Sequence, residues 1–232
     1  AAERCAGEGA AMLFTPEMSG LLDRDRKRAA PHIVAESANP VLAATREAVR
    51  QADLAASWGA AGLMLLPPMR YKSDHRETVT YFRTIADSTD LPIMIYNNPV
   101  DYKVEVTLDM FEELAACPNI GAVKESTRDV TNVTRMINRF GSRFSILCGV
   151  DTLAMEELCM GADGWVAGLV DAFPRETVAI YELVKTGRIE EAAAIYRWFM
   201  PLLELDIHPK LVQYIKLAEK MTGIGTEHVR AP

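Results

Sequence analysis

The stretch at residues 92–126, PIMIYNNPVDYKVEVTLDMFEELAACPNIGAVKES, contains two apolar runs with a helix-like segment between them. The first run ends in a tyrosine followed by two asparagines, and the second ends in a lysine. Short, nearly continuous apolar runs separated by an amphipathic segment are typical of parallel strands buried on both faces. The stretch therefore predicts a strand–helix–strand unit in which each strand ends in an ionisable side chain.

The same alternation continues on both sides of this stretch. Strand-like runs end at Leu66, Tyr96, Lys124, Gly149 and Gly168, so that successive ends are 30, 28, 25 and 19 residues apart. This steady spacing favours an α/β fold of the (β/α)8 barrel type. A doubly wound sheet is disfavoured because no glycine-rich dinucleotide fingerprint follows any of the strands. The helices expected between and around the strands cover residues 16–30, 43–58, 73–86, 108–116, 130–140, 153–160 and 174–186.

A further strand is expected at residues 32–35, which brings the total to six, two fewer than a closed barrel needs. Since the sequence starts at Ala1 without a methionine, we expect residues 1–186 to form a (β/α)8 barrel that lacks its first unit or units. An open six-stranded sheet is the alternative. Residues 187–232 are expected to form a C-terminal helical extension, with helices at 189–203 and 209–221, packed on the barrel or used as an oligomer contact.

Composition restricts the class of partner. The net charge of −7 and the mixed character of the only basic cluster, at residues 24–28, argue against nucleic acid and anionic membranes as partners. No apolar run approaches the roughly 20 residues needed to cross a bilayer, and the first ten residues do not resemble a secretory signal. We therefore expect a cytoplasmic protein that acts on a small molecule.

The cysteines and histidines do not indicate a metal site. The histidines form no HxH or HxxxH pair, so zinc is not expected. The cysteines have no metal-type spacing and are expected to be small buried residues in a reducing compartment. The four cysteines are Cys5, Cys117, Cys148 and Cys159.

Barrel active sites form at the carboxyl ends of the strands. A lysine held in apolar surroundings there, such as Lys124, could attack a carbonyl group to form a Schiff base. Tyr96, one strand away, could relay protons during that reaction. The alternatives are a strand-end lysine that reaches solvent or pairs with Glu125 or Asp151, and a core tyrosine with a satisfied hydroxyl group.

The YNxP motif at residues 96–99 and the VKES motif at 123–126 resemble the dihydrodipicolinate synthase and N-acetylneuraminate lyase family. WGAAGLMLLPP (58–68), GVDT (149–152) and GADGWVAGLVDAFP (161–174) extend the resemblance, which covers residues 45–218. It implies a (β/α)8 barrel with extra C-terminal helices, usually a homotetramer, with Lys124 as the Schiff-base lysine and Tyr96 as the proton relay. It also implies that Gly168 lines the substrate pocket and that neither a metal nor an organic cofactor is needed.

The sequence departs from this family at the positions that bind substrate. Asp101 stands where the dihydrodipicolinate-forming members carry an arginine that binds a carboxylate, and an acid would repel that group. The two threonine positions hold Cys5 and Ala6. The tyrosine that a neighbouring subunit lends is displaced, with Tyr71 close to its place. Asn97 and Ser126 are further candidates for substrate binding, although Asn97 and Asn98 are also suited to holding the strand end and the loop turn.

The leading hypothesis is a lyase that forms a Schiff base with a 2-oxo acid or its cyclic imine, by aldol chemistry, dehydration or deamination. The segments YNNPVDYKVEVT and ELDIHPKLVQ resemble the branch that deaminates pyrroline-4-hydroxy-2-carboxylate in hydroxyproline degradation. The alternatives are dihydrodipicolinate synthase itself and a non-catalytic relative that binds a 2-oxo acid. A metal-dependent aldolase would need clustered histidine and carboxylate ligands, which the strand ends lack. A homotetramer or homodimer is expected.

Overall fold

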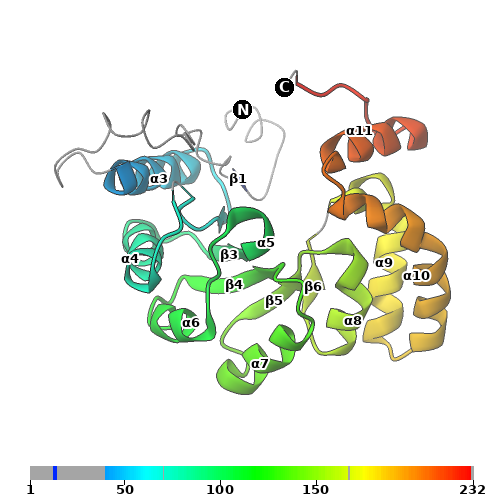
Figure 1. Ribbon diagram of the computed structural model, residues 1–232, viewed down its shortest axis with the longest axis horizontal. Helices are drawn as coiled ribbons and strands as arrows, with labels where there is room; N and C mark the ends of the chain where they lie inside the picture. Colours follow the sequence, from blue (N-terminus) through cyan, green and yellow to red (C-terminus); the bar gives the residue numbers. More distant parts are fainter. Residues whose placement is uncertain (1–12, 15–39, 70, 167, 231–232) are drawn as a thin grey trace. The chain divides into compact units, whose positions relative to one another are not determined.

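The computed structural model describes residues 13–14, 40–69, 71–166 and 168–230. Strands and helices alternate along most of this length (Figure 1). The chain divides into two compact units, Ala1–Val123 and Lys124–Pro232, and each is described by itself. The helix expected at 16–30 and the strand expected at 32–35 lie outside the described residues.

The first unit is a set of parallel strands with helices between them. Strand β1 pairs with β2, and β2 pairs with β3 through partners such as Leu63 and Ile93. The Ile93 N–H also donates to the Asn119 carbonyl, at 2.7 Å, just before β4 begins. In chain order the elements are β1 (Leu13–Phe14), α3 (Pro40–Ser57), β2 (Leu63–Leu65), α4 (His75–Ala86), β3 (Ile93–Asn97), α5 (Pro99–Tyr102), α6 (Leu108–Leu114) and the start of β4 (Ile120–Glu125).

The core of the first unit explains why its strands are apolar throughout. All three residues of β2 are buried, as are Ile93 and Ile95 of β3, because helices cover the strands. Helix α4 turns Phe82 and Ile85 into this core, and both side chains are fully buried. Its start is set by a capping box, in which Asp74 and Glu77 bond each other's backbone N–H groups.

The second unit begins within β4 and continues the alternation. Strands β5 and β6 are parallel, and the Gly149 N–H donates to the Glu125 carbonyl at 2.7 Å, which links the end of β5 to the end of β4. The remaining elements are α7 (Thr131–Phe140), β5 (Ser145–Cys148), η3 (Asp151–Leu153), α8 (Ala154–Cys159), β6 (Gly164–Trp165), η4 (Leu169–Ala172), α9 (Pro174–Lys185), α10 (Ile189–Leu203), η5 (Glu204–Ile207) and α11 (Leu211–Thr222).

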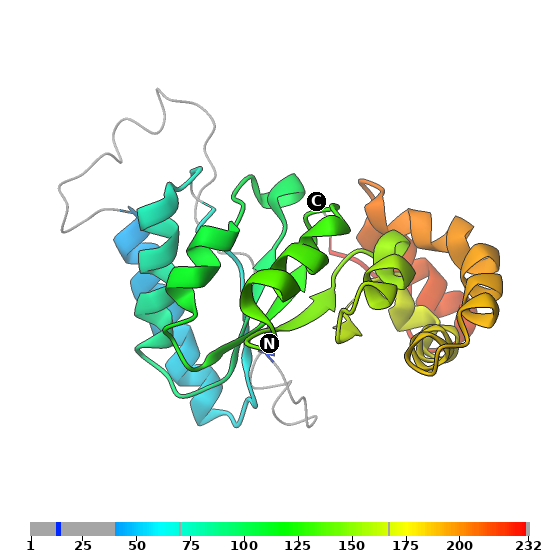
Figure 2. The same ribbon diagram turned by 90° about the horizontal axis from the view of Figure 1, so that it is seen from below.

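Helices α9 and α10 lie side by side and share a core (Figures 1 and 2). That core is formed by Ile180 of α9 and by Tyr196, Phe199 and Leu203 of α10. The three α10 residues recur at intervals of three and four positions, so they form one buried face of the helix. Trp198 is 67% exposed and stacks on Phe199 from outside, with ring centroids 6.1 Å apart.

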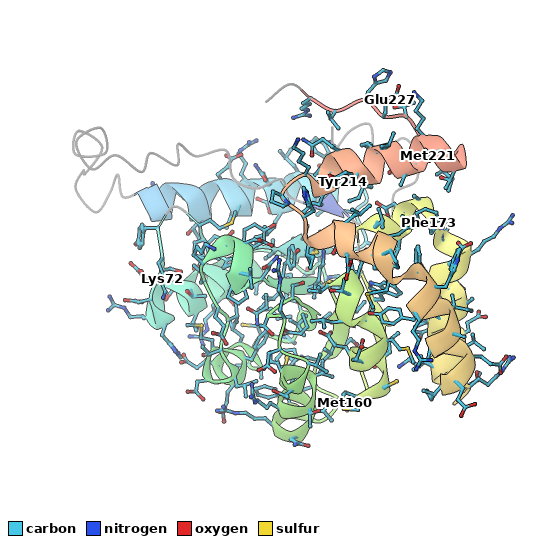
Figure 3. The ribbon with its side chains drawn as sticks, turned by 45° about the vertical axis from the view of Figure 1, so that its right-hand side comes forward. Lys72, Met160, Phe173, Tyr214, Met221 and Glu227 are labelled. Atoms are coloured by element: carbon cyan, nitrogen blue, oxygen red, sulfur yellow. The ribbon has the colours of Figure 1, made fainter. Side chains whose placement is uncertain are left out.

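Helix α11 follows η5 and packs against η4 and η5. None of its residues is buried, and Met221 near its end is 80% exposed. Tyr214, in its first turn, is labelled in Figure 3. Its ring meets that of His208 in the preceding loop edge to face, with ring centroids 4.9 Å apart.

The elements predicted from residue 43 onward are all present, and their bounds agree within a few residues. The one-turn helix α5 and the short β1 were not expected. The prediction that every cysteine is buried is wrong for Cys159, which is exposed at the end of the short helix α8, whereas Cys117 and Cys148 are buried. No helix in the described part of the chain has the length and apolar character needed to cross a membrane. The boundary expected at residue 186 stays a prediction.

Candidate active site

In the first unit, Tyr96 is presented by the end of β3. The phenol is partly exposed, while Ile95 before it and Asn97 after it are buried. Its oxygen accepts a hydrogen bond from Asn98 Nδ2 at 3.3 Å. Its ring meets that of Tyr102 edge to face, with centroids 5.5 Å apart. These contacts orient the hydroxyl group at the carboxyl end of a strand, which is the position the sequence predicts for it.

Asn97 holds the loop that follows β3. It is fully buried, its Nδ2 donates to the Val106 carbonyl at 3.1 Å, and its Oδ1 accepts from the Val106 N–H at 2.9 Å. A buried amide that bonds one backbone residue through both ends is well suited to closing a loop. The structure therefore supports the loop-holding role expected for Asn97.

Asp101 is tied to the same strand end. Asn98 Nδ2 donates to Asp101 Oδ2 at 2.8 Å, and the Asp101 N–H donates back to Asn98 Oδ1 at 3.2 Å. Asn98 thereby caps α5 and connects Asp101 to the Tyr96 phenol. Asp101, which the sequence comparison above expects in the place of an arginine, is thus a neighbour of Tyr96, the predicted proton relay.

Tyr71 is held by its own unit. Its hydroxyl group donates to Glu77 Oε1 of α4 at 2.6 Å, and its side chain is exposed. Partial desolvation of its hydroxyl group, and then the hydrogen bond to Glu77 and the charge of that residue, raise the pKa of Tyr71 to about 12. Cys5 and Ala6, at the threonine positions, lie outside the described residues.

In the second unit, Lys124 and Ser126 project from the end of β4 toward Gly149 of the β5 end. A Cβ atom added at Gly149 would lie 2.7 Å from Lys124 Cγ and 2.8 Å from Lys124 Cε, and closer still to Ser126 Oγ. Real Cβ atoms do not approach that closely, so the lysine side chain occupies space that only a glycine leaves open. Val123 and Glu125, the alternate residues of the strand, are fully buried.

Ser126 places a buried hydroxyl group beside the lysine. Its oxygen is buried and has no hydrogen-bond partner within the described residues. Buried polar groups without partners are uncommon and call for an explanation. A bound substrate would supply the missing partner for this hydroxyl group.

Lys124 also has a carboxylate within electrostatic range. Burial and the charge of Glu219 raise the pKa of Asp171, in η4, while the charges of Lys216 and Lys124 act in the opposite direction. Lys216 and Glu219 of α11 form an ion pair at 2.8 Å. The Asp171 carboxyl group of η4 is therefore influenced by positive charge from both β4 and α11.

Asp151 organises the loop between β6 and η4. Its side chain is fully buried and accepts hydrogen bonds from Trp165 Nε1 at 3.2 Å and from the Leu169 N–H at 2.9 Å. Its carbonyl accepts from the Tyr196 hydroxyl at 2.9 Å. Burial, and then the charge of Asp206, raise the pKa of Asp151 to about 7.

Gly168, the predicted pocket residue, lies between Asp151 and the C-terminal helices. A Cβ atom there would lie 3.6 Å from Asp206 Cγ and 3.2 Å from Ile215 Cδ1. Asp206 Oδ2 also accepts a long hydrogen bond, 3.4 Å, from the Asp151 N–H. The sequence alone gives no signal for Asp206 beyond the resemblance of its segment, ELDIHPKLVQ, to one branch of the family.

Helix α8 holds a second buried carboxyl group, which the sequence alone did not indicate. Glu157 of α8 is fully buried, and neither of its oxygens has a hydrogen-bond partner within the described residues. Burial raises its pKa to about 8, and the charge of Glu125 adds to the shift. Glu125 accepts from the Thr127 N–H and from Asn132 Nδ2, at 2.7 and 2.8 Å. The two buried carboxyl groups therefore differ, because Glu125 accepts two hydrogen bonds and Glu157 accepts none from the described residues.

The structure thus brings Tyr96, Asn98 and Asp101 together in one unit, and Lys124, Ser126 and Gly149 in the other. The pairing of Tyr96 with Lys124 stays a prediction, because the two residues belong to different units. Over the described ranges, no group of three or more His, Cys, Asp or Glu side chains is arranged to hold a metal ion.

Comparison with known proteins identifies relatives over most of the chain. A family model described as the Dihydrodipicolinate synthetase family matches residues 35–232. The 4-hydroxy-tetrahydrodipicolinate synthase 1 of Halalkalibacterium halodurans is 30% identical over 222 residues, which cover 92% of this chain and 75% of the relative. The 4-hydroxy-tetrahydrodipicolinate synthase of Methanothrix thermoacetophila is 31% identical, with 94% and 76% covered.

Solved structures show the same fold, and the expected (β/α)8 barrel class is confirmed by this similarity. The crystal structure of dihydrodipicolinate synthase from Aquifex aeolicus matches with a TM-score of 0.75 at 31% identity, covering 80% of this chain and 64% of that one. A prophage protein of the same family from E. coli K12, solved in complex with pyruvate, matches with a TM-score of 0.75 at 25% identity, covering 81% and 65%. The chain therefore spans about two thirds of the length of these structures.

Proposed function

Because the chain belongs to the Dihydrodipicolinate synthetase family, we propose that it is a lyase that forms a Schiff base between Lys124 and a 2-oxo acid or its cyclic imine. The observation that carries the proposal is the place of Lys124 at the end of β4. Its side chain lies against the bare backbone of Gly149 and beside the buried hydroxyl group of Ser126.

In the proposed mechanism, Lys124 Nζ attacks the C2 carbonyl carbon to form a carbinolamine, which loses water to give an imine. The protonated imine withdraws electrons from C2, so that a proton on C3 becomes acidic and bonds at C3 and C4 can form or break. Tyr96 relays protons to and from the carbinolamine and the leaving group. Ser126 supplies a hydrogen bond to the bound substrate. No metal or organic cofactor takes part in these steps.

Pyruvate is the 2-oxo acid that we propose first, because a solved relative at 25% identity carries it. The relatives reported above are named 4-hydroxy-tetrahydrodipicolinate synthases, which supports that reaction as the candidate for the full activity. These names do not favour the hydroxyproline-degrading branch. We propose a homotetramer or a homodimer for the assembly, as in the resembling family.

Asp101 supports a second candidate, the dehydration and deamination of a cyclic imine such as pyrroline-4-hydroxy-2-carboxylate. The carboxylate of Asp101 is fixed beside Tyr96 by Asn98. It would repel the carboxylate that an arginine binds in dihydrodipicolinate-forming members. Release of ammonia from this imine, compared with pyruvate-dependent consumption of aspartate semialdehyde, separates the two candidates.

Borohydride reduction in the presence of pyruvate tests the Schiff base. We expect a stable adduct on the peptide that contains Lys124, found by mass spectrometry, and none in Lys124→Ala. The matched control is Lys220→Ala, which removes an exposed lysine of α11 that pairs with Glu227. If Lys124 stays unmodified in the folded wild-type protein, the proposed enzyme activity is wrong, and a non-catalytic protein that binds a 2-oxo acid becomes the better interpretation.

A further inference from the structure

Asp206 reaches the backbone at Gly168 from an element outside the strand–helix units. It lies in η5, between α10 and α11, and its Cγ and Oδ1 occupy the space where a side chain at residue 168 would stand. Gly168 follows β6 at the carboxyl end of the strand, where sites form in barrels of this kind. The C-terminal segment therefore places a carboxylate next to Gly168, at the carboxyl end of β6 in the second unit.

The position of Asp206 is determined by its partners in the fold. Its Oδ2 accepts from the Asp151 N–H, 55 residues away in sequence, while Oδ1 lies toward Gly168. The Asp151 carboxyl group is buried and is engaged by Trp165 and Leu169. Asp206 is the less buried of the two carboxyl groups. Of these two carboxyl groups, that of Asp206 is therefore the more accessible to a ligand.

A partly buried carboxylate discriminates strongly between ligands. It accepts a hydrogen bond from a hydroxyl or amino group, and it repels a carboxylate because desolvation weakens the screening between like charges. A site built around a polar partner rejects a ligand that cannot satisfy it by large factors. Asp151 lies beside Asp206, and the charge of Asp206 already helps to raise the pKa of the Asp151 carboxyl group. A ligand carboxylate at the same place would add a further negative charge, which is still less favourable.

We propose that Asp206 is a specificity-determining residue of the site, selecting 2-oxo acids or imines whose far end carries a hydroxyl or amino group and rejecting those that end in a carboxylate. This inference rests on the proposed Schiff-base function. It assigns to the C-terminal helical segment a direct part in the choice of substrate.

The test is reductive trapping on Lys124 with two probes, 4-hydroxy-2-oxopentanoate and 2-oxopentanedioate, and with pyruvate as reference. For each probe, the concentration that labels half of Lys124 is measured by mass spectrometry. In the wild type we expect half-labelling at an at least about 10-fold lower concentration of the hydroxylated probe.

Asp206→Asn keeps the oxygen that accepts from the Asp151 N–H but removes the charge. We expect it to reduce the preference by about 10-fold while pyruvate is still trapped. Asp206→Glu, which retains the carboxylate, should keep the preference in the wild-type direction. Glu204→Gln is the matched control, because it removes the same charge from an exposed position of the same η5 helix and should leave the preference unchanged.

An unaltered preference in Asp206→Asn, with normal pyruvate trapping, would overturn the inference, as would a wild type without preference. Loss of preference in both Asp206→Asn and Asp206→Glu would also overturn it, because the carboxylate would then not be the determinant. Failure of pyruvate trapping in the wild type would instead overturn the proposed function itself.

Discussion

The two units hold their candidate residues in different ways. Around Tyr96, the hydrogen bonds join residues that are 2, 3 and 9 positions apart, from Asn98 to Tyr96, from Asn98 to Asp101 and between Asn97 and Val106. Around Asp151, they join residues that are 14, 18, 45 and 55 positions apart. The first arrangement is contained in one loop, whereas the second requires β6, η4, α10 and η5 to be in place.

This difference has a thermodynamic consequence. A loop of a few residues loses little entropy when it closes, and closing longer loops costs progressively more. The residues around Tyr96 can adopt their arrangement as soon as β3 and α5 form. Those around Asp151 are held only while the second unit is folded, so changes there should affect stability as well as activity. The predictions below test this contrast, from the largest effect to the smallest.

Replacing the nucleophile should have the largest effect. Lys124→Ala should lower turnover by about 10⁴-fold or more, because it removes the amine on which the imine is proposed to form. Steady-state kinetics with the substrate identified by the trapping experiment measures the loss. The fold should be retained, as judged by circular dichroism. Turnover within a factor of about ten of the wild type would mean that the wrong lysine has been chosen.

The contrast itself is tested by Asp151→Ala and Asn98→Ala. Asp151→Ala leaves Trp165 Nε1 and the Leu169 N–H without their acceptor in a buried place, so the free energy of unfolding should fall by about 3 kcal/mol. Asn98→Ala removes a helix cap and should lower it by about 1 kcal/mol. Urea unfolding measures both. Equal losses in the two variants would show that local and long-range bonding matter alike.

Tyr96→Phe should affect rate without affecting stability. Its hydroxyl group is proposed to relay protons, so turnover should fall by about 10²-fold while reductive trapping of pyruvate on Lys124 remains detectable. Rapid mixing separates imine formation from the later steps. Complete loss of trapping in this variant would place Tyr96 in the binding step and contradict its role as a relay.

Gly149→Ala tests whether the lysine depends on the space beside it. The added methyl group would collide with Lys124 Cγ and Cε, so trapping should be slowed by about 10-fold or more. Gly121→Ala is the matched control, because a Cβ atom there meets nothing within 4 Å. If both variants trap pyruvate equally fast, the space beside Gly149 does not affect Schiff-base formation on Lys124.

Glu157→Gln should alter only the pH dependence of stability. Burial raises the pKa of Glu157 from 4.5 to about 8, so between these values the folded chain keeps a proton that the unfolded chain releases. Stability therefore falls as the pH rises through this window. The Gln variant lacks this contribution and should gain about 1 kcal/mol or more over the wild type between pH 5 and pH 9. If urea unfolding gives the same free-energy difference between the variant and the wild type at pH 5 and at pH 9, Glu157 is not protonated in the folded chain.

Much of this architecture could be predicted from local patterns. The apolar runs of β2, β3 and β4 stand out because both faces of each strand are covered, and the helices between them show their buried faces at regular spacing. The short helix α5 was missed because its four residues are too few for a helical period to be seen.

The sequence by itself determined the class of fold, the strand ends that carry Tyr96 and Lys124, and the acid at residue 101, since each is a local pattern of residue types. Tertiary structure alone decided that Gly149 makes room for the lysine, that the buried Glu157 has no hydrogen-bond partner in the part of the chain that the structure describes, and that Asp206 reaches Gly168 and Asp151. These features depend on contacts between residues far apart in the chain, and such contacts are created only when the elements pack together.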